Sequence, residues 1–316
     1  MNPFAKVAAV AAQGSPMLQS VTQVTPGRHL LVDGDALCYV CAGSDDTAPA
    51  QARINLFQRI ERATAASGAE AVRILVTARD SHKGHRYAVA VAKPYQGQRK
   101  SGRRPKNWEF LRKLLEDNTT LGPKHWPIEA TSVAEADDLF SQYAHRLGWD
   151  NVVIHTQDKD MRMIPGLHLT WDDFHLFAIE PTEWAKVRDD KVYGRKWFWL
   201  QMLHGDTADN VPGLPKWTRP DGKQALCGEV TAGKLLAETT SEADALVIVR
   251  PQYRLWYGPE DGDTAMLEQG ILLWMRRHAG NVFDVCEDGG PLFGIPEAAK
   301  TAIKLRIAGA QACLPS

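Results

Sequence analysis

Nine carboxylates could act together on a phosphate ester through bound metal ions. Three of their five groups follow apolar runs typical of buried strands, one opens a predicted helix and one follows an aromatic helix. The nine are Asp33, Asp80, Glu135, Asp137, Asp138, Asp158, Asp160, Asp206 and Asp209. Oxygen ligands without His or Cys suit hard cations such as Mg²⁺ or Mn²⁺. More carboxylates than one ion can use indicate two ions, the usual device for phosphoryl transfer.

The elements that must position these acids alternate between strand and helix over residues 29–171. The runs "HLLVD", "AVRILVTARD" and "NVVIH" predict strands, with "LHLTW" as a further candidate. This order is typical of an α/β fold with a parallel sheet and helices on both faces. Functional groups gather at the carboxyl ends of such strands. The sequence therefore predicts that the nine acids meet at one edge of the sheet.

Helical patterns lie between and after these strands. An amphipathic helix over 51–68 is closed by Gly68, and a second is expected to start at Ser132 and stop at Gly148. Pro105 is placed as a first helical residue before "KNWEFLRKLLED", whereas "YAVAVA" at 87–92 is weakly strand-like. From about residue 182 the chain is predicted to be mostly helical.

Each acidic group also has a structural explanation. Ser132 and Glu135 match a capping box, Asp137 and Asp138 suit a helix N-terminus, and the remaining acids suit turns, caps or solvated loops. These explanations fail when taken together, because two charges 4 Å apart repel by about 4 kcal/mol at an effective dielectric of 20. Bound divalent cations would remove that repulsion.

A basic segment interrupts the strands. Residues 93–113 carry eight Lys and Arg against Glu109, a net charge of +7 in a chain of net charge −1. Tyr95 and Trp108 are interleaved with these cations. Because cations pair with phosphates and aromatic rings stack on unpaired bases, the segment favours a nucleic-acid partner over a solvated loop.

The composition limits the classes of protein to which this chain can belong. The chain has 316 residues, 44% hydrophobic and 24% charged, with five scattered cysteines and a single C-x-x-C at Cys38 and Cys41. Neither a disulfide framework nor a complete zinc site follows from these cysteines. No run is long and apolar enough to span a bilayer. We expect a soluble, cytoplasmic protein.

Six stretches together resemble a known family. They are "LLVDGDAL", "RILVTARDSHKGHRYAV", "PYQGQRKSGRRPKNWEFL", "EADD", "IHTQDKDM" and "HGDTADNVPGLP". They are similar to the flap-endonuclease superfamily, specifically the 5′→3′ exonucleases of short-tailed bacteriophages, over about residues 28–240. Together the motifs "EADD", "DKD" and "GDTADNVPG" are specific at these separations, although each alone is weak.

The resemblance implies a PIN-like parallel twisted sheet flanked by helices. The composition of residues 1–27, which end at Pro26-Gly27, separately indicates a leader. The resemblance implies a nuclease domain at 28–181 with a basic helical arch at 93–125, and a helical duplex-binding region at 182–281. That region would contain a helix–three-turn–helix motif. Residues 282–316 match nothing in the family and form an unassigned tail.

Site roles implied by the resemblance follow the motifs. The nine acids would bind two or more Mg²⁺ ions, with Mn²⁺ able to substitute. The candidates for gripping the substrate phosphate are Arg86, Lys93, Arg99 and Lys100. The candidates for binding DNA are Tyr95, Arg103, Arg104, Lys106, Gly213, Gly228, Thr231 and Lys234.

The sequence departs from the family twice. Gln96 stands where the family has a lysine beside the scissile phosphate, so Lys93 or Lys100 is expected to replace it. The stretch "KWTRPDGKQALC" at 216–227 interrupts the duplex-binding motif as an insertion.

Three functions are compatible with these residues. The first is a metal-dependent 5′→3′ exonuclease or flap endonuclease, acting on DNA with duplex and 5′ single-stranded ends and on RNA–DNA hybrids. The second is a haloacid-dehalogenase-type phosphatase with Asp33 as nucleophile, which needs a buried strand before "GDTADN". The third is a non-catalytic protein that binds branched DNA, which predicts lost carboxylates.

Overall fold

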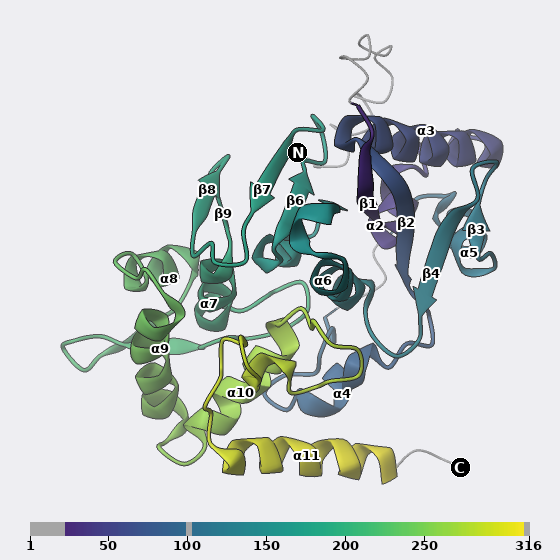
Figure 1. Cartoon of the computed structure of the whole chain (residues 1–316). Helices are drawn as coiled ribbons and strands as arrows, with labels where there is room; N and C mark the ends of the chain where they lie inside the picture. Colours follow the sequence, from purple (N-terminus) through teal and green to yellow (C-terminus); the bar gives the residue numbers. More distant parts are fainter. Residues whose placement is uncertain (1–22, 99–102, 313–316) are drawn as a thin grey trace. The chain divides into compact units, whose positions relative to one another are not determined.

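The chain forms two compact units. A computed structural model describes residues 23–98 and 103–312. Its sheet unit comprises described residues up to 80, then 103–161 and 166–178. Its helical unit comprises described residues 81–98, 162–165 and 179–312 (Figure 1).

A seven-stranded sheet is the framework of the sheet unit, in the order β3-β4-β2-β1-β5-β6-β7. The strands are β1 (Thr25–Asp33), β2 (Ala69–Thr77), β3 (Thr120–Leu121), β4 (Trp126–Thr131), β5 (Val152–His155), β6 (Gly166–Leu169) and β7 (Leu176–Ile179). β1 pairs in parallel with β2 and β5, β2 with β4, and β5 with β6, whereas β3 is antiparallel to β4. The carboxyl ends of β4, β2, β1 and β5 therefore lie along one edge. The predicted α/β fold with a parallel sheet is confirmed.

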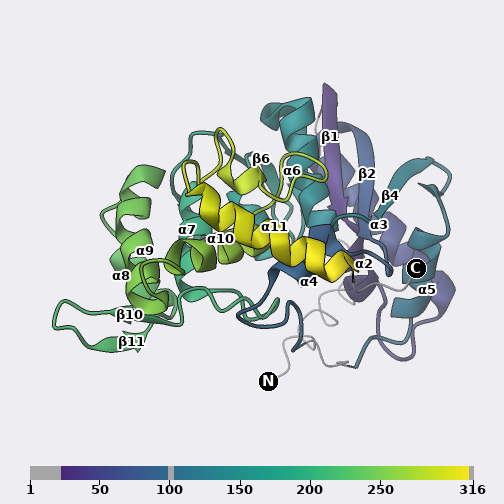
Figure 2. The ribbon, with the colours of Figure 1, turned by 90° about the horizontal axis from the view of Figure 1, so that it is seen from below.

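Helices cover both faces of this sheet. They are α2 (Gly34–Val40), α3 (Pro49–Ser67), α5 (Trp108–Glu116) and α6 (Ala136–Leu147), with short 3₁₀ turns η2 (Trp149–Asn151) and η3 (Lys159–Met163). Leu30 and Val32 of β1 pack into one hydrophobic core with residues of α2, α3 and α5. Leu31, between them, is also fully buried, so its face is covered as well. Figure 2 shows α6 on the other side of the strands.

Three sequence predictions about local structure are corrected. The helix expected from Ser132 begins at Ala136, because Glu135 is the N-cap and forms the capping box with Asp138 one turn later than expected. Pro105 is not in the first turn of α5, which begins at Trp108 after a turn in which the Trp108 amide donates to the Pro105 carbonyl.

The third correction concerns "YAVAVA". Its first residues belong to helix α4 (Arg86–Val89) and not to a strand. The amides of Val91 and Ala92 donate to the Glu268 carboxylate at 3.0 and 2.8 Å, so a side chain takes the place of a strand partner.

The helical unit is built around one buried helix. Its elements are η1 (Lys83–His85), α4, α7 (Arg195–His204), α8 (Glu229–Leu235), α9 (Glu242–Tyr257), α10 (Gly262–Leu273), η4 (Asp284–Cys286) and α11 (Glu297–Ala312). α10 packs against α4, α7, α9 and α11, and Met266, Leu267 and Ile271 of α10 are buried.

Two hairpins complete the helical unit. β8 (Lys186–Arg188) pairs with β9 (Lys191–Tyr193), and β10 (Lys216–Thr218) pairs with β11 (Gln224–Leu226). The second hairpin is the stretch predicted to be an insertion. Across the described residues, no helix combines the length and apolar character needed to cross a membrane.

Candidate metal centre

Asp33 is the acid at the end of β1. It caps α2, because its Oδ1 accepts the Ala36 amide at 2.9 Å, while its Oδ2 accepts the Thr156 hydroxyl at 2.6 Å. The residue is 5% exposed. Burial, followed by the charge of Asp35, raises the pKa of Asp33 from 3.8 to about 7, although both hydrogen bonds oppose the rise.

Asp137 lies in the first turn of α6 and is surrounded by acids. Burial raises its pKa well above the ordinary value, and the nearby charges of Asp158, Glu135, Asp33 and Asp160 raise it further. Carboxylates that follow β1, β4 and β5 therefore interact electrostatically. The sheet edge brings five of the nine predicted acids together.

The loop after β5 is ordered by its own polar groups. The Thr156 hydroxyl accepts the Asp158 amide at 2.9 Å, and the Asp158 carboxylate accepts the Asp160 amide at 2.8 Å. Because the same hydroxyl donates to Asp33, Thr156 links the acids of β1 to those of β5. Thr156 is not among the site residues predicted from the sequence, although a hydroxyl two residues before Asp158 is the available signal.

The chemistry of this cluster fits hard divalent cations. Its donors are carboxylate oxygens, and the pKa values of Asp33 and Asp137 are raised first by burial and then by the negative charges of neighbouring acids. A bound divalent cation would offset the repulsion between these carboxylates and favour their charged forms.

The remaining two acids of the sheet unit are placed differently. Asp138 is fully buried, and its carboxylate accepts the Glu135 amide within the capping box at 3.4 Å. Asp80 is exposed beyond the end of β2. Neither is among the largest influences on the pKa of Asp33 or Asp137.

Asp206 and Asp209 belong to the helical unit. Asp206 is 2% exposed, and its carboxylate accepts the Ala208 amide at 2.8 Å. Asp209 accepts the Tyr95 hydroxyl at 2.8 Å and the Gln96 amide group at 3.0 Å. Gln96, at the position where the family has lysine, is therefore a hydrogen-bond partner of a predicted metal ligand.

The loop that carries these two acids is tightly folded. Gly205 has a φ of +74°, and a Cβ there would lie 2.2 Å from the Val211 carbonyl oxygen. The amide of Gly213, a DNA-binding candidate, donates to the buried Gln269 side chain at 3.0 Å, so the fold already uses this amide.

Two of the four cations expected to grip phosphate, Arg86 and Lys93, lie within the described residues. Arg86 is fully buried and donates to the Leu272 and Trp274 carbonyls at 3.3 and 3.0 Å. The packing of the helical unit thus accounts for it. Lys93 is exposed in the same unit, and Arg99 and Lys100 lie outside the described residues.

The candidate DNA-binding side chains of the sheet unit are exposed and contact neighbouring residues of the same unit. Arg103 pairs with the Asp45 carboxylate, and Lys106 donates to the Asp45 carbonyl at 3.1 Å. Arg104 lies 4.0 Å from the Trp108 ring centroid, and Trp108 is 8% exposed. In the helical unit Tyr95 is 4% exposed. Neither ring is open to a base in this conformation.

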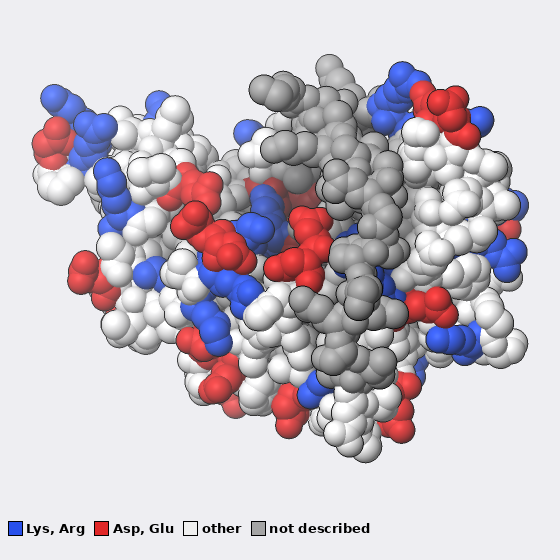
Figure 3. All heavy atoms as spheres, turned by 90° about the horizontal axis from the view of Figure 1, so that it is seen from above, with Lys and Arg blue, Asp and Glu red and all other residues white. Residues whose placement is uncertain are grey.

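The last DNA-binding candidates lie at α8. Gly228 is its N-cap residue, Thr231 is half-buried and Lys234 is exposed. Among the visible atoms in Figure 3, acidic and basic side chains are interspersed, in keeping with the net charge of −1.

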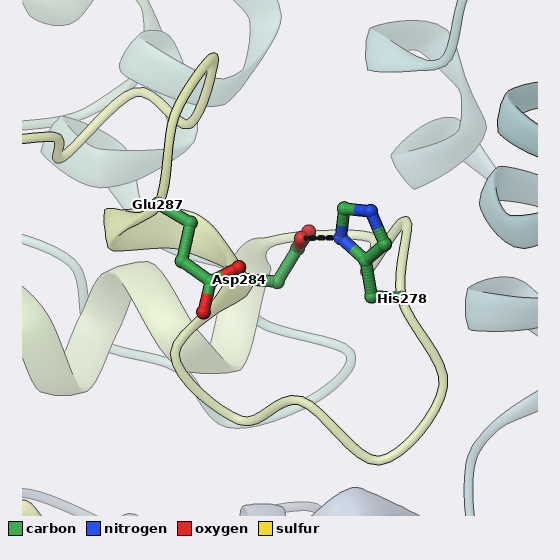
Figure 4. Close-up of side chains that lie close together, drawn as sticks. All are labelled: His278, Asp284 and Glu287. Carbon is green, nitrogen blue, oxygen red and sulfur yellow. Dashed lines mark hydrogen bonds and ion pairs between the residues drawn. The ribbon is translucent and has the colours of Figure 1, made fainter.

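His278, Asp284 and Glu287 form a second cluster (Figure 4). Here the pKa of the buried aspartate is lowered and not raised. Asp284 accepts hydrogen bonds from Trp274 Nε1 at 2.7 Å, His278 Nδ1 at 2.6 Å and Arg277 Nε at 3.2 Å. Burial by itself would raise the pKa of Asp284, but the hydrogen bonds from these donors outweigh burial and lower it. The carboxylate is already neutralised by Arg277, so this cluster is an ion-pair network.

Comparisons with solved structures connect this fold to known enzymes. A crystal structure of the D15 protein of bacteriophage T5 with metal ions aligns with 89% of this chain and 98% of its own, at 16% identity and a TM-score of 0.55. The T5 5′-exonuclease with bound zinc aligns with 89% and 99%, at 16% identity and a TM-score of 0.54. The chain has the fold of the T5 5′-exonuclease. That fold class confirms the PIN-like architecture predicted from the sequence.

A third T5 structure is a flap-endonuclease variant in a complex with DNA and metal ions. It aligns with 90% of this chain and 99% of its own, at 15% identity and a TM-score of 0.52. No family profile matches the sequence, and no curated protein matches it. The likeness is therefore one of fold, and the chemistry depends on the residues described above.

The structure does not meet the requirement of the phosphatase alternative. "GDTADN" follows α7, a helix, and not the buried strand that this alternative needs.

Proposed function

We propose that this protein is a metal-dependent nuclease that hydrolyses DNA phosphodiesters from 5′ ends or at 5′ flaps. The observation that carries the proposal is the crowding of five carboxylates at the carboxyl edge of the sheet, with raised pKa values at Asp33 and Asp137. The shared fold with T5 structures that contain metal ions and DNA supports it.

Within this proposal the acids hold two or more Mg²⁺ ions, and Mn²⁺ can substitute. Asp33, Glu135 and Asp158 lie nearest the reacting phosphate, while Asp206 and Asp209 also bind a cation. When bound, the ions supply an activated water and stabilise the charge on the leaving 3′ oxygen. Thr156 orients the acids by its hydrogen bonds to Asp33 and the Asp158 amide.

The proposed substrates are duplex DNA with 5′ single-stranded ends or flaps, and RNA–DNA hybrids. The cations of residues 93–113, apart from the buried Arg112, would supply sequence-independent attraction to phosphates. The products are 5′-phosphorylated nucleotides or short oligonucleotides. We place the activity in the cytoplasm, which is the host's if the protein is encoded by a phage.

The test uses duplex DNA with a 5′ flap, labelled separately at either end, with Mg²⁺ or with EDTA. The wild-type protein is expected to release the 5′ label first, and only with Mg²⁺. Asp158→Ala combined with Asp160→Ala should reduce the rate by at least about a thousandfold, since it removes metal ligands.

A matched control removes two exposed acids of the same unit, Asp150 and Asp172. That double alanine variant should cleave at the wild-type rate. Wild-type cleavage in EDTA, or full activity of the Asp158/Asp160 variant, would refute the proposal. Turnover of a small phosphate ester without cleavage of DNA would favour a phosphatase.

A further inference from the structure

Arg112 connects α5 to the sheet edge that carries the acids. Its side chain is 7% exposed and donates to the Asp35 carboxylate and to the Thr77 carbonyl at the end of β2. Its Nε also donates to Glu116 at 2.8 Å, one turn along the same helix. Three oxygens from three elements thus surround one guanidinium.

Asp35, the partner of Arg112, lies two residues after Asp33. Asp33 is the N-cap of α2 and Asp35 lies in the first turn of the same helix, so both carboxylates lie at the junction of β1 and α2. The second oxygen of Asp35 accepts the Thr77 amide at 3.3 Å. Asp35 is therefore held between Arg112 and the end of β2, and its charge is opposed by a cation.

Thr77 extends this connection to α6. Its hydroxyl oxygen accepts the Ala136 amide at 2.9 Å, directly between Glu135 and Asp137. The end of β2 is thus joined to the N-terminus of α6 by Thr77, and to α2 and α5 by Asp35 and Arg112. This arrangement spans the elements that present the acids of β1 and α6.

We propose that Arg112 is a positioning residue that keeps the Asp35 carboxylate out of the cation site and fixes the end of β2 beside it. The inference rests on the proposed metal site. Arg112 touches neither substrate nor cation in this role. A planar guanidinium suits it, because one side chain can serve two carboxylates and a carbonyl simultaneously, which an ammonium cannot do in the same geometry.

The primary experiment measures Mn²⁺ binding without DNA, by the electron paramagnetic resonance signal of free Mn²⁺. Arg112→Gln leaves Asp35 uncompensated and should tighten Mn²⁺ binding about tenfold. Asp35→Asn leaves Arg112 in excess and should weaken it severalfold. In the double variant the two charge changes cancel, and the affinity should return to within about threefold of wild type.

Cleavage supplies the second readout. With saturating metal and DNA, Arg112→Gln should lower kcat at least tenfold, because a free carboxylate competes for the ions, and Asp35→Asn in that background should restore most of the loss. If Arg112→Gln does not fold, Arg112→Lys replaces it. The lysine keeps the charge, and so the wild-type Mn²⁺ affinity, but it lacks the planar fork and should still lower kcat severalfold; wild-type kcat would then contradict the positioning role. The control is Lys113→Gln, which loses the same charge from an exposed pair with Asp117 on the same helix.

Each outcome has one meaning. If Arg112→Gln and Lys113→Gln behave alike, Arg112 has no positioning role. If Asp35→Asn abolishes Mn²⁺ binding and the double variant does not recover it, Asp35 is a ligand and the inference is wrong. If the wild-type protein binds no Mn²⁺, the proposed function itself fails.

Discussion

Replacing Asp33 with asparagine should stabilise the metal-free protein at alkaline pH. Burial and Asp35 raise the pKa of Asp33 from 3.8 to about 7, so folding favours the protonated form. The stability that this group contributes is fully present below pH 3.8 and is lost as the pH rises through about 7. Asparagine keeps the shape and the helix cap but carries no charge.

The magnitude follows from the size of the pKa change. A rise from 3.8 to about 7 corresponds to at most about 4 kcal/mol of lost stability at pH 8. Asparagine also weakens the hydrogen bond from Thr156, at a cost of about 1 kcal/mol. The free energy of unfolding of the variant should therefore be about 1–3 kcal/mol higher than that of wild type at pH 8 in EDTA.

Magnesium should narrow this difference in stability. Binding to the folded state adds about 2.7 kcal/mol when the free ion is at 100 times its dissociation constant, and only the wild-type protein gains this in full. The assay is urea unfolding at pH 5 and pH 8, with EDTA or Mg²⁺, beside Asp46→Asn as an exposed control. A variant less stable than wild type in EDTA at pH 8, or equally stabilised by Mg²⁺, would refute the reasoning.

Three further predictions concern other polar contacts. Thr156→Val should lower kcat about tenfold, which is about 1.4 kcal/mol of activation free energy, with little change in the urea midpoint. Valine removes the two hydrogen bonds that connect Asp33 after β1 to the loop after β5. Asp263→Asn should cost about 1–3 kcal/mol at pH 7, since its two arginine partners on α9 lower its pKa to about 2. That contribution exists above pH 3.8 and disappears as the pH falls through about 2, so wild type and variant should converge in acid urea titrations. Glu268→Gln should lower the unfolding free energy by about 1–3 kcal/mol, measured in urea, because Arg306 and two backbone amides lose a charged acceptor.

The strands and their acids were predictable because each depends on local pattern. Apolar runs ending at Asp33 and before Asp158 locate β1 and β5, and parallel order then brings their carboxyl ends to one edge. Gly68 ends α3 in a left-handed conformation, as its position after the amphipathic repeat predicts.

Contacts between residues far apart in the chain could not be predicted from the sequence. The pairing of Arg112 with Asp35 joins positions 77 residues apart, and nothing in either local pattern announces it. Buried Tyr95 and Trp108 look like base-stacking residues in sequence, because composition does not reveal which ring the core covers. The start of α6 moved by one turn because Asp138, and not Glu135, completes the cap.

The most direct test is anomalous X-ray scattering from crystals soaked in Mn²⁺. The account predicts manganese peaks within coordination distance of carboxylate oxygens of Asp33, Asp137 and Asp158. Well-ordered side chains at this edge, with no anomalous peak among them at saturating Mn²⁺, would contradict it.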